Sequence, residues 1–229
     1  PNHLVLDWNV YFTADNPTKD DWKNIIAPSL KNIRRALMRK AKPQRQVWLP
    51  SRVHLSAGLA YGWMFRATKG FQLIASDALK EENPEDVADE SLFGKLEFSM
   101  SSVSRKNNSL LLGISIAKDV RPTIIRMTTN GYACRAKLLG DIENLGRTSI
   151  FNTTHANKLA EATVKSILTA RDRYKTQKID LLISSSVQYA TYLGWHLNAC
   201  GDFAYWQYRM KYGDAIPSCD LDSLWDGES

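Results

Sequence analysis

The chain has 229 residues, of which 44% are hydrophobic and 24% are charged, and its formal net charge is +6. This size and composition suffice for one large domain or two closely packed halves without stabilising disulfides. No apolar run reaches the roughly 18 residues of a membrane-spanning helix, so no such segment and no membrane partner is expected. The positive charge is compatible with an anionic partner, although the cations between Lys31 and Arg45 are more simply interpreted as a solvated helix face.

The first half predicts alternating strands and helices. In chain order we expect a strand at 4–8, a helix at 21–40, a basic turn at 42–45, a strand at 47–50, a polar loop, a helix at 55–67 and a strand at 71–75. Apolar residues recur with the helical period in the first of these helices. An acidic stretch at 80–91 is interpreted as an exposed insertion, and 99–109 as a second loop.

The second half predicts the same order of elements. We expect a strand at 111–117, a helix at 156–174, a turn at 175–178, a strand at 179–183, a polar loop, a helix at 187–199 and a strand at 203–209. His155-Ala156-Asn157 superficially resembles a nuclease fragment, but no second histidine accompanies it, so we interpret it as a helix start. Alternation of strands and helices indicates an α/β fold with a largely parallel sheet.

A weak internal repeat supports two equivalent halves. The segment from Leu49 to Phe71 is echoed from Leu181 to Phe203, 132 residues later, and this offset places Gly62-Trp63 on Gly194-Trp195. The repeat predicts two Rossmann-like halves at about 1–108 and 109–229, whose polar loops could face one another across a crevice. The alternative is one ordinary α/β domain without duplication.

Motifs for catalysis or metal binding are missing from the sequence. The cysteines Cys134, Cys200 and Cys219 are too scattered for a disulfide framework or a zinc site, and their small number suits a reducing cytoplasm. The four histidines lack metal-ligand spacing, and no phosphate-binding glycine loop or GxSxG nucleophile motif occurs. The serines at 184–186 have no evident base. As hydroxyl donors at a helix start they suit phosphate binding better than nucleophilic catalysis.

Five short runs together carry a family resemblance. They are 4–8, 51–58 followed by Gly62, 114–120, the helix entry at His155-Ala156, and 193–199 with 205–208. In order and spacing they resemble SAVED domains, which fuse two CARF-like Rossmann halves and follow effector domains in bacterial CBASS and CRISPR defence systems. The resemblance covers nearly the whole chain and is nearest to the sensor part of HNH-SAVED nuclease effectors.

The resemblance implies a ligand-sensing fragment that is not itself an enzyme and carries no cofactor. Its ligand would be a cyclic oligonucleotide, with a cyclic dinucleotide such as cGAMP favoured, and ligand binding would drive self-association and activate a linked HNH-type DNA endonuclease. That effector domain would precede this fragment, and any divalent metal or DNA contact would belong to it. The open alternatives are a cyclic-oligonucleotide phosphodiesterase, a sensor of cyclic tri- or tetranucleotides in a CRISPR-linked system, and a plain interaction domain.

The expected ligand site combines donors to phosphate with rings that stack on bases. Arg52 could make a forked contact with a phosphate or a guanine edge, and each stacked base could contribute ~1–3 kcal/mol. Asp119 could accept from a base amine or brace its own loop. Trp63 and Trp195 are expected in the core. The full set of predicted ligand-binding residues is Trp8, Ser51, Arg52, His54, Ser56, Lys118, Asp119, Arg121, Ser184, Ser185, Ser186, Gln188, Tyr205 and Trp206.

Overall fold

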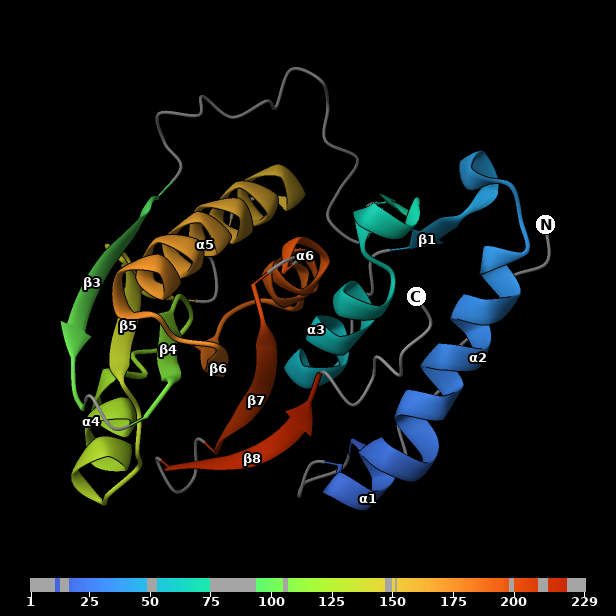
Figure 1. Cartoon of the computed structure of the whole chain (residues 1–229). Helices are drawn as coiled ribbons and strands as arrows, with labels where there is room; N and C mark the ends of the chain where they lie inside the picture. Colours follow the sequence, from blue (N-terminus) through green and yellow to red (C-terminus); the bar gives the residue numbers. More distant parts are fainter. Residues whose placement is uncertain are drawn as a thin grey trace.

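The structure is a computed structural model that describes residues 11–12, 17–48, 53–74, 94–104, 107–146, 150, 152–197, 200–209 and 214–221. In these residues the chain forms an α/β fold with two sheets (Figure 1). The predicted strand at 4–8 and the acidic stretch at 80–91 lie outside the described residues.

Among the described residues up to 74, the elements follow the predicted order of helix, turn, strand, helix and strand. Its elements are α1 (Lys19–Asp21), η2 (Trp22–Ile26), α2 (Ala27–Met38), η3 (Lys42–Gln44), β1 (Gln46–Trp48), α3 (Leu55–Met64), η4 (Ala67–Lys69) and β2 (Gln72–Ile74). Thr18 starts the first helical run with a reciprocal capping box, in which Asp21 N donates to Thr18 Oγ1 at 3.1 Å. β1 and β2 form a two-stranded parallel sheet.

The second half contains a six-stranded sheet in the order β3-β5-β4-β6-β7-β8, in which β5, β4, β6 and β7 run parallel and both outer strands are antiparallel. Its elements are β3 (Leu96–Ser102), β4 (Ser109–Ser115), α4 (Arg121–Thr129), β5 (Ala136–Ile142), α5 (Thr153–Tyr174), β6 (Lys178–Ser184), α6 (Val187–His196), β7 (Asp202–Arg209) and β8 (Asp214–Asp220).

Several elements of this sheet differ from the sequence prediction. The loop expected at 99–109 is wrong in part, because β3 extends to Ser102 and β4 begins at Ser109. β5, α4 and β8 were not expected. β3 precedes the predicted boundary near residue 108, yet it pairs with β5 of the second half.

Helices cover both faces of the six-stranded sheet. α5, α6 and α3 pack on one face in the main core, whereas α4 packs on the other with a smaller cluster around Leu111, Leu182 and Trp206 (Figure 1). β4 is buried along its whole length, as expected for a central parallel strand. None of the described helices combines the length and apolarity needed to cross a membrane.

α3 and α6 show that the two halves are related. At the offset of 132 residues, α3 and α6 coincide in both their first and last residues. A Cβ on Gly62 would lie 1.9 Å from Thr191 O, and a Cβ on Gly194 would lie 2.2 Å from Leu59 O. Thr191 and Leu59 are equivalent at the same offset, so each helix makes the same close contact with the other. A Cβ on Gly58 would meet Val187 at the start of α6, and a Cβ on Gly62 would meet Trp195 N near its end, so the contacts advance in the same direction along both helices. The two helices thus pack in parallel about a pseudo-twofold axis, which confirms the duplicated fold.

Candidate functional site

The strand order reverses direction at β4, which makes the crevice outside the carboxyl ends of β4 and β6 the candidate ligand site. From β4 the chain crosses through α4 to β5 on one side, and from β5 it crosses through α5 to β6 on the other side of β4. Ligands in open α/β sheets bind outside the strand ends at such a reversal of direction. The predicted residues of loops 118–121 and 184–186 follow these two strands.

Backbone hydrogen bonds join the two strand ends. The carbonyl oxygen of Ser184 accepts from both Ile116 N and Ala117 N at 2.9 Å. Gly146 N, from the loop after β5, donates to Ile116 O at 3.0 Å. The loops after β4, β5 and β6 are thus held together, although the sequence prediction did not include the β5 loop.

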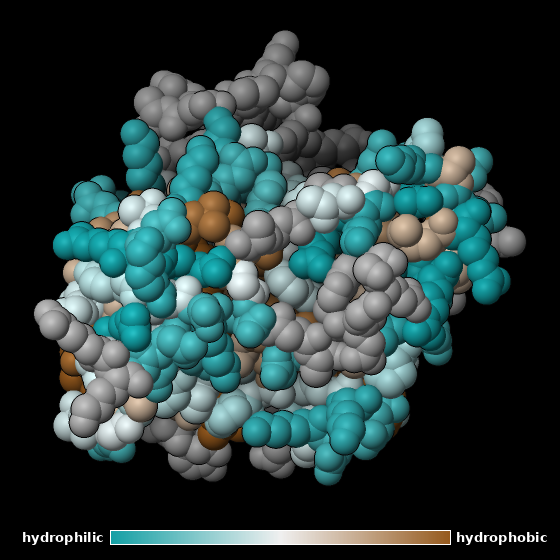
Figure 2. Space-filling view, in the orientation of Figure 1, coloured by the Kyte–Doolittle hydropathy of each residue, from teal (hydrophilic) through white to brown (hydrophobic). Residues whose placement is uncertain are grey.

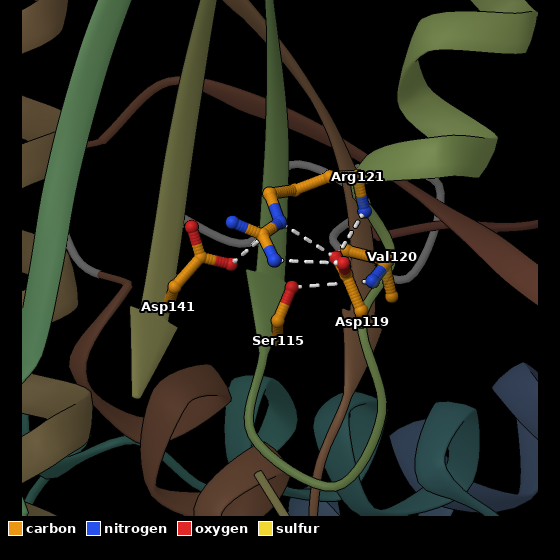
Figure 3. Close-up of polar contacts among 5 residues, drawn as sticks. All are labelled: Ser115, Asp119, Val120, Arg121 and Asp141. Atoms are coloured by element: carbon orange, nitrogen blue, oxygen red, sulfur yellow. Dashed lines mark hydrogen bonds and ion pairs between the residues drawn. The ribbon is translucent and has the colours of Figure 1, made fainter. Parts of the chain in front are cut away.

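Asp119 and Arg121 brace the β4 loop (Figure 3). Asp119 accepts from Arg121 N at 2.9 Å and from the Arg121 side chain at 2.8 Å through Nε and 2.8 Å through a terminal nitrogen. The hydrogen bond from the Arg121 side chain is the main reason that the pKa of Asp119 lies below its usual value. Arg121 Nε also lies 3.7 Å from Asp141 Oδ1, and Ser115 Oγ accepts from Val120 N at 3.1 Å. This geometry favours the bracing role for Asp119.

Lys118 is the remaining cation of this loop. Its side chain is exposed, and no described acidic residue pairs with it. It can therefore meet an anionic group without breaking an ion pair in the described part of the chain.

The serines after β6 differ from one another. Ser184 is 8% exposed, so it is nearly buried, whereas Ser185 and Gln188 are partly exposed. Ser186 is the N-cap of α6, and its Oγ accepts from Tyr189 N at 3.2 Å. Ser185 Oγ donates to Ser186 O at 3.1 Å. Ser185 is thus the serine of this loop best placed to contact a ligand.

His54 occupies the equivalent N-cap position of α3 but makes no capping hydrogen bond with its side chain. Its Nδ1 lies 2.8 Å from Oγ of the fully buried Ser56, and its ring packs against Phe12 at a centroid distance of 5.4 Å. Burial lowers the pKa of His54 to about 4, so the imidazole is neutral at pH 7. The predicted residues Trp8, Ser51 and Arg52 lie outside the described residues.

The helices that start beside this crevice have no acidic residue in their first turns. α3, α4, α5 and α6 all follow strand ends, and none has an acid in its first turn, whereas α1 has Asp20 and Asp21 there. Acids are favourable at helix N-termini because the free N–H groups and the helix dipole are positive. Because α3 and α6 are parallel, their two positive ends lie side by side and are available to an anion from outside.

The structure does not bring Tyr205 and Trp206 to the crevice. They pair with Leu181 and Leu182 in the middle of β6 and point to opposite faces of the sheet. Tyr205 is 1% exposed in the main core. Trp206 Nε1 donates to Asp180 Oδ1 at 3.2 Å, in the smaller cluster. Both faces of this strand are therefore packed.

The remaining sequence predictions concern core and helix-start residues. Trp63 is buried edge-on against Phe203, and Trp195 packs on the same core, as predicted. His155 lies in the first turn of α5, whose N-cap is Asn152, so the interpretation of a helix start is confirmed.

The described part of the chain contains neither a disulfide nor a metal cluster. The three cysteines there are free and buried. No group of three or more histidine, cysteine or acidic side chains in the described ranges could hold a metal ion.

With this geometry established, comparison with known proteins identifies the family. Residues 30–220 match the model of the SAVED domain, the SMODS-associated and fused to various effectors sensor domain. The chain belongs to the SAVED family. Its duplicated α/β architecture agrees with the expected pair of CARF-like halves. No curated protein matches the chain.

Solved structures show the same fold at low sequence identity. The Acinetobacter baumannii Cap4 SAVED/CARF-domain containing receptor with the cyclic trinucleotide 2'3'3'-cAAA has a TM-score of 0.65 and 16% identity over 89% of this chain and 44% of the receptor. The same receptor with 3'3'3'-cAAA has a TM-score of 0.61 and 16% identity over 95% of this chain and 50% of the receptor. The Moraxella osloensis Cap4 receptor has a TM-score of 0.54 and 14% identity over 88% of this chain and 45% of the receptor. This SAVED chain thus spans about half the length of these receptors.

Proposed function

We propose that this chain senses a cyclic oligonucleotide, which binds outside the carboxyl ends of β4 and β6. The parallel packing of α3 and α6 carries the proposal, because it sets two helix N-termini without first-turn acids beside one another. Paired positive helix ends suit a ligand with more than one phosphate. Membership of a sensor family and the fold shared with receptors solved with cAAA support the same class of ligand.

The described side chains suggest which residue would contact which part of the ligand. Lys118 would neutralise a phosphate, and the amides at the start of α6 would donate to another, with Ser185 and Gln188 beside them. His54 is neutral and engaged with Ser56, so it would contribute a ring face or a hydrogen bond rather than charge. On sequence grounds, Arg52 would add a forked contact.

The finer identity of the ligand is part of the proposal. The resemblance to HNH-SAVED effectors favours a cyclic dinucleotide such as cGAMP, and one Cap4 receptor of the same fold was solved with two different cyclic trinucleotides. Occupancy would change how copies of the chain associate, and this association would activate a linked DNA endonuclease. Such coupling requires the ligand to bind the associated state more tightly than the free state.

Calorimetric titration tests the proposal directly. The chain would be titrated with cGAMP and 3'3'3'-cAAA, with a linear dinucleotide as the control, and each mixture would be examined by analytical ultracentrifugation. We expect one ring size to bind at least about tenfold more tightly than the linear control, a difference of about 1.4 kcal/mol, and to shift the chain to larger species. If neither cyclic nucleotide bound more tightly than the linear control, the proposed function would be contradicted.

Asp119→Asn distinguishes the two roles of Asp119. If Asp119 only braces Arg121, the substitution removes a negative charge beside the Arg121 guanidinium. The affinity for the cyclic oligonucleotide should then stay equal or rise by a few fold. Because both side chains are partly exposed to solvent, the free energy of unfolding should fall by less than ~1 kcal/mol. A loss of affinity of about tenfold or more would instead assign Asp119 to base recognition.

A further inference from the structure

A second concave surface lies away from the crevice. A groove of about 840 Å³ separates the α1–α2 segment from the edge of the six-stranded sheet. Its sheet wall includes Lys178 at the amino end of β6, and Ser184 at the crevice lies six positions further along the strand, about 20 Å away. The groove and the proposed sensor site are thus distinct surfaces.

Cations predominate along this groove. Its helical wall presents Lys19, Lys23, Lys31 and Arg35, and Lys178 faces them from the sheet. Of the two acids in the described lining, Asp180 already accepts from Trp206 Nε1 and lies 3.8 Å from Lys178 Nζ. Figure 2 shows hydrophilic residues over α1 and α2.

Local sequence strengthens the positive charge of the helical wall. The segment from 22 to 48 contains eight lysines and arginines and no acidic residue. Lys19 and Lys23 are exposed, and neither pairs with an acid among the described residues. Their charges are therefore available to a ligand.

The spacing of these cations fits an extended anion. Lys19 and Lys23, like Lys31 and Arg35, are four residues apart, which corresponds to a rise of about 6 Å, and the whole row covers about 24 Å. A compact anion could reach only part of such a row. A nucleic acid presents a charge at every nucleotide, and each duplex strand carries one per roughly 3.4 Å of axis.

We propose that this groove binds the phosphate backbone of a nucleic acid. Four of the five cations in the described lining are lysines, whose point charges suit contacts with phosphate that do not depend on sequence. The partly exposed ring of Trp206 also lines the groove and offers a surface on which a base could stack. An acidic peptide fits less well, because the edge strand β8 contains Pro217, which lacks the N–H that strand addition would use.

Fluorescence anisotropy with a labelled DNA strand and its duplex tests the inference. We expect the chain to bind both without any cyclic nucleotide, with an affinity that falls steeply between about 50 and 200 mM salt. The double variant Lys19→Glu/Lys23→Glu should weaken binding at least about tenfold and reduce the slope of log K against log salt by about two. An acid at position 19 is favourable in the first turn, so the variant should fold, which a thermal melt would check.

A matched control separates the groove from the net charge of the chain. Lys95→Glu/Lys165→Glu makes the same change of charge at exposed positions that do not line the groove, and its affinity should stay within about twofold. Equal losses in the two double variants would overturn the inference, as would absent DNA binding or equally tight binding of poly-glutamate. Ser185→Glu should retain DNA binding, so failure of the cyclic-nucleotide site and failure of this groove are distinguishable.

Discussion

α3 and α6 are alike where they touch and different where they begin. Gly62 and Gly194 make equivalent close contacts with the backbone of the opposite helix. At the N-terminal ends, Ser186 caps α6 through Tyr189 N, whereas His54 makes no capping bond and turns its ring toward Ser56. The helix contact constrains both helices in the same way, so the repeat is clearest there. The helix starts are free of that constraint, and they can present unlike groups to an asymmetric ligand.

A methyl group at either Gly62 or Gly194 should disturb the helix contact and have the largest effect on stability. In Gly62→Ala or Gly194→Ala the new Cβ would need to enter space held by a backbone carbonyl, at 1.9 and 2.2 Å, so the helices must separate. We expect each substitution to lower the free energy of unfolding by about 3 kcal/mol or more, and the two by similar amounts. Urea unfolding monitored by circular dichroism measures this.

Gly58→Ala provides a graded control in the same interface. Its Cβ would meet the side chains of Thr191 and Val187 at 3.0 and 3.1 Å, which can adjust, so a smaller loss is expected. A loss confined to one of Gly62 and Gly194 would contradict the pseudo-twofold packing.

Titration of His54 should make the start of α3 sensitive to pH, unlike the start of α6, and this is the second largest effect expected. Burial lowers its pKa to about 4 in the folded chain, from about 6.5 when unfolded. Between these values the unfolded state binds more protons, so the free energy of unfolding should decrease as pH falls from about 6.5 to 4, by up to about 3 kcal/mol. His155 and His196, whose pKa values burial also lowers, contribute in the same direction.

His54→Gln isolates the contribution of this one residue. Urea unfolding at several pH values should show a weaker pH dependence in the variant than in the natural chain. Identical pH profiles would mean that His54 is not protected from protonation, contrary to its burial beside Phe12.

Loss of the cap at the other helix should have a smaller effect. Ser186→Ala removes the acceptor of Tyr189 N, and we expect the free energy of unfolding to fall by about 1 kcal/mol at any pH where the chain is folded. The loss should not depend on pH between 4 and 6.5, unlike that of His54→Gln, because serine does not titrate there. A pH-dependent loss would show that the caps of α3 and α6 are coupled.

The paired halves could be predicted from the sequence because their helices have long periodic apolar patterns or a repeated dipeptide. α2, α5, α3 and α6 have regular apolar faces or a repeated Gly-Trp pair, and their positions agree with the expected ranges. α4 was missed because it is short and its exposed face includes Ile125. β5 was missed with it, since the segment between β4 and α5 was not divided into elements. β8 contains a proline, which disfavours a strand prediction except at a sheet edge.

The site could be predicted as a pair of loops but not as a detailed set of residues. The expected loops at 118–121 and 184–186 do lie together, because carboxyl ends of parallel strands share one edge. Tyr205 and Trp206 were chosen for their rings, and only the strand register shows that they lie beside the middle of β6 and away from its carboxyl end. The partnership of Arg121 with Asp141 depends on β5, so it could not be foreseen without that strand.

Ser185→Glu tests the central claim most directly, because it adds a carboxylate where the N-terminus of α6 should attract a ligand phosphate. Calorimetry with the cyclic oligonucleotide that binds the natural chain, paired with a thermal melt, would be compared with Thr169→Glu, the same charge change on the exposed face of α5. The account predicts that Ser185→Glu weakens binding at least about tenfold, or about 1.4 kcal/mol, while its stability is unchanged or slightly higher, and that Thr169→Glu binds like the natural chain. Undiminished affinity in folded Ser185→Glu would contradict a ligand site at the paired starts of α3 and α6.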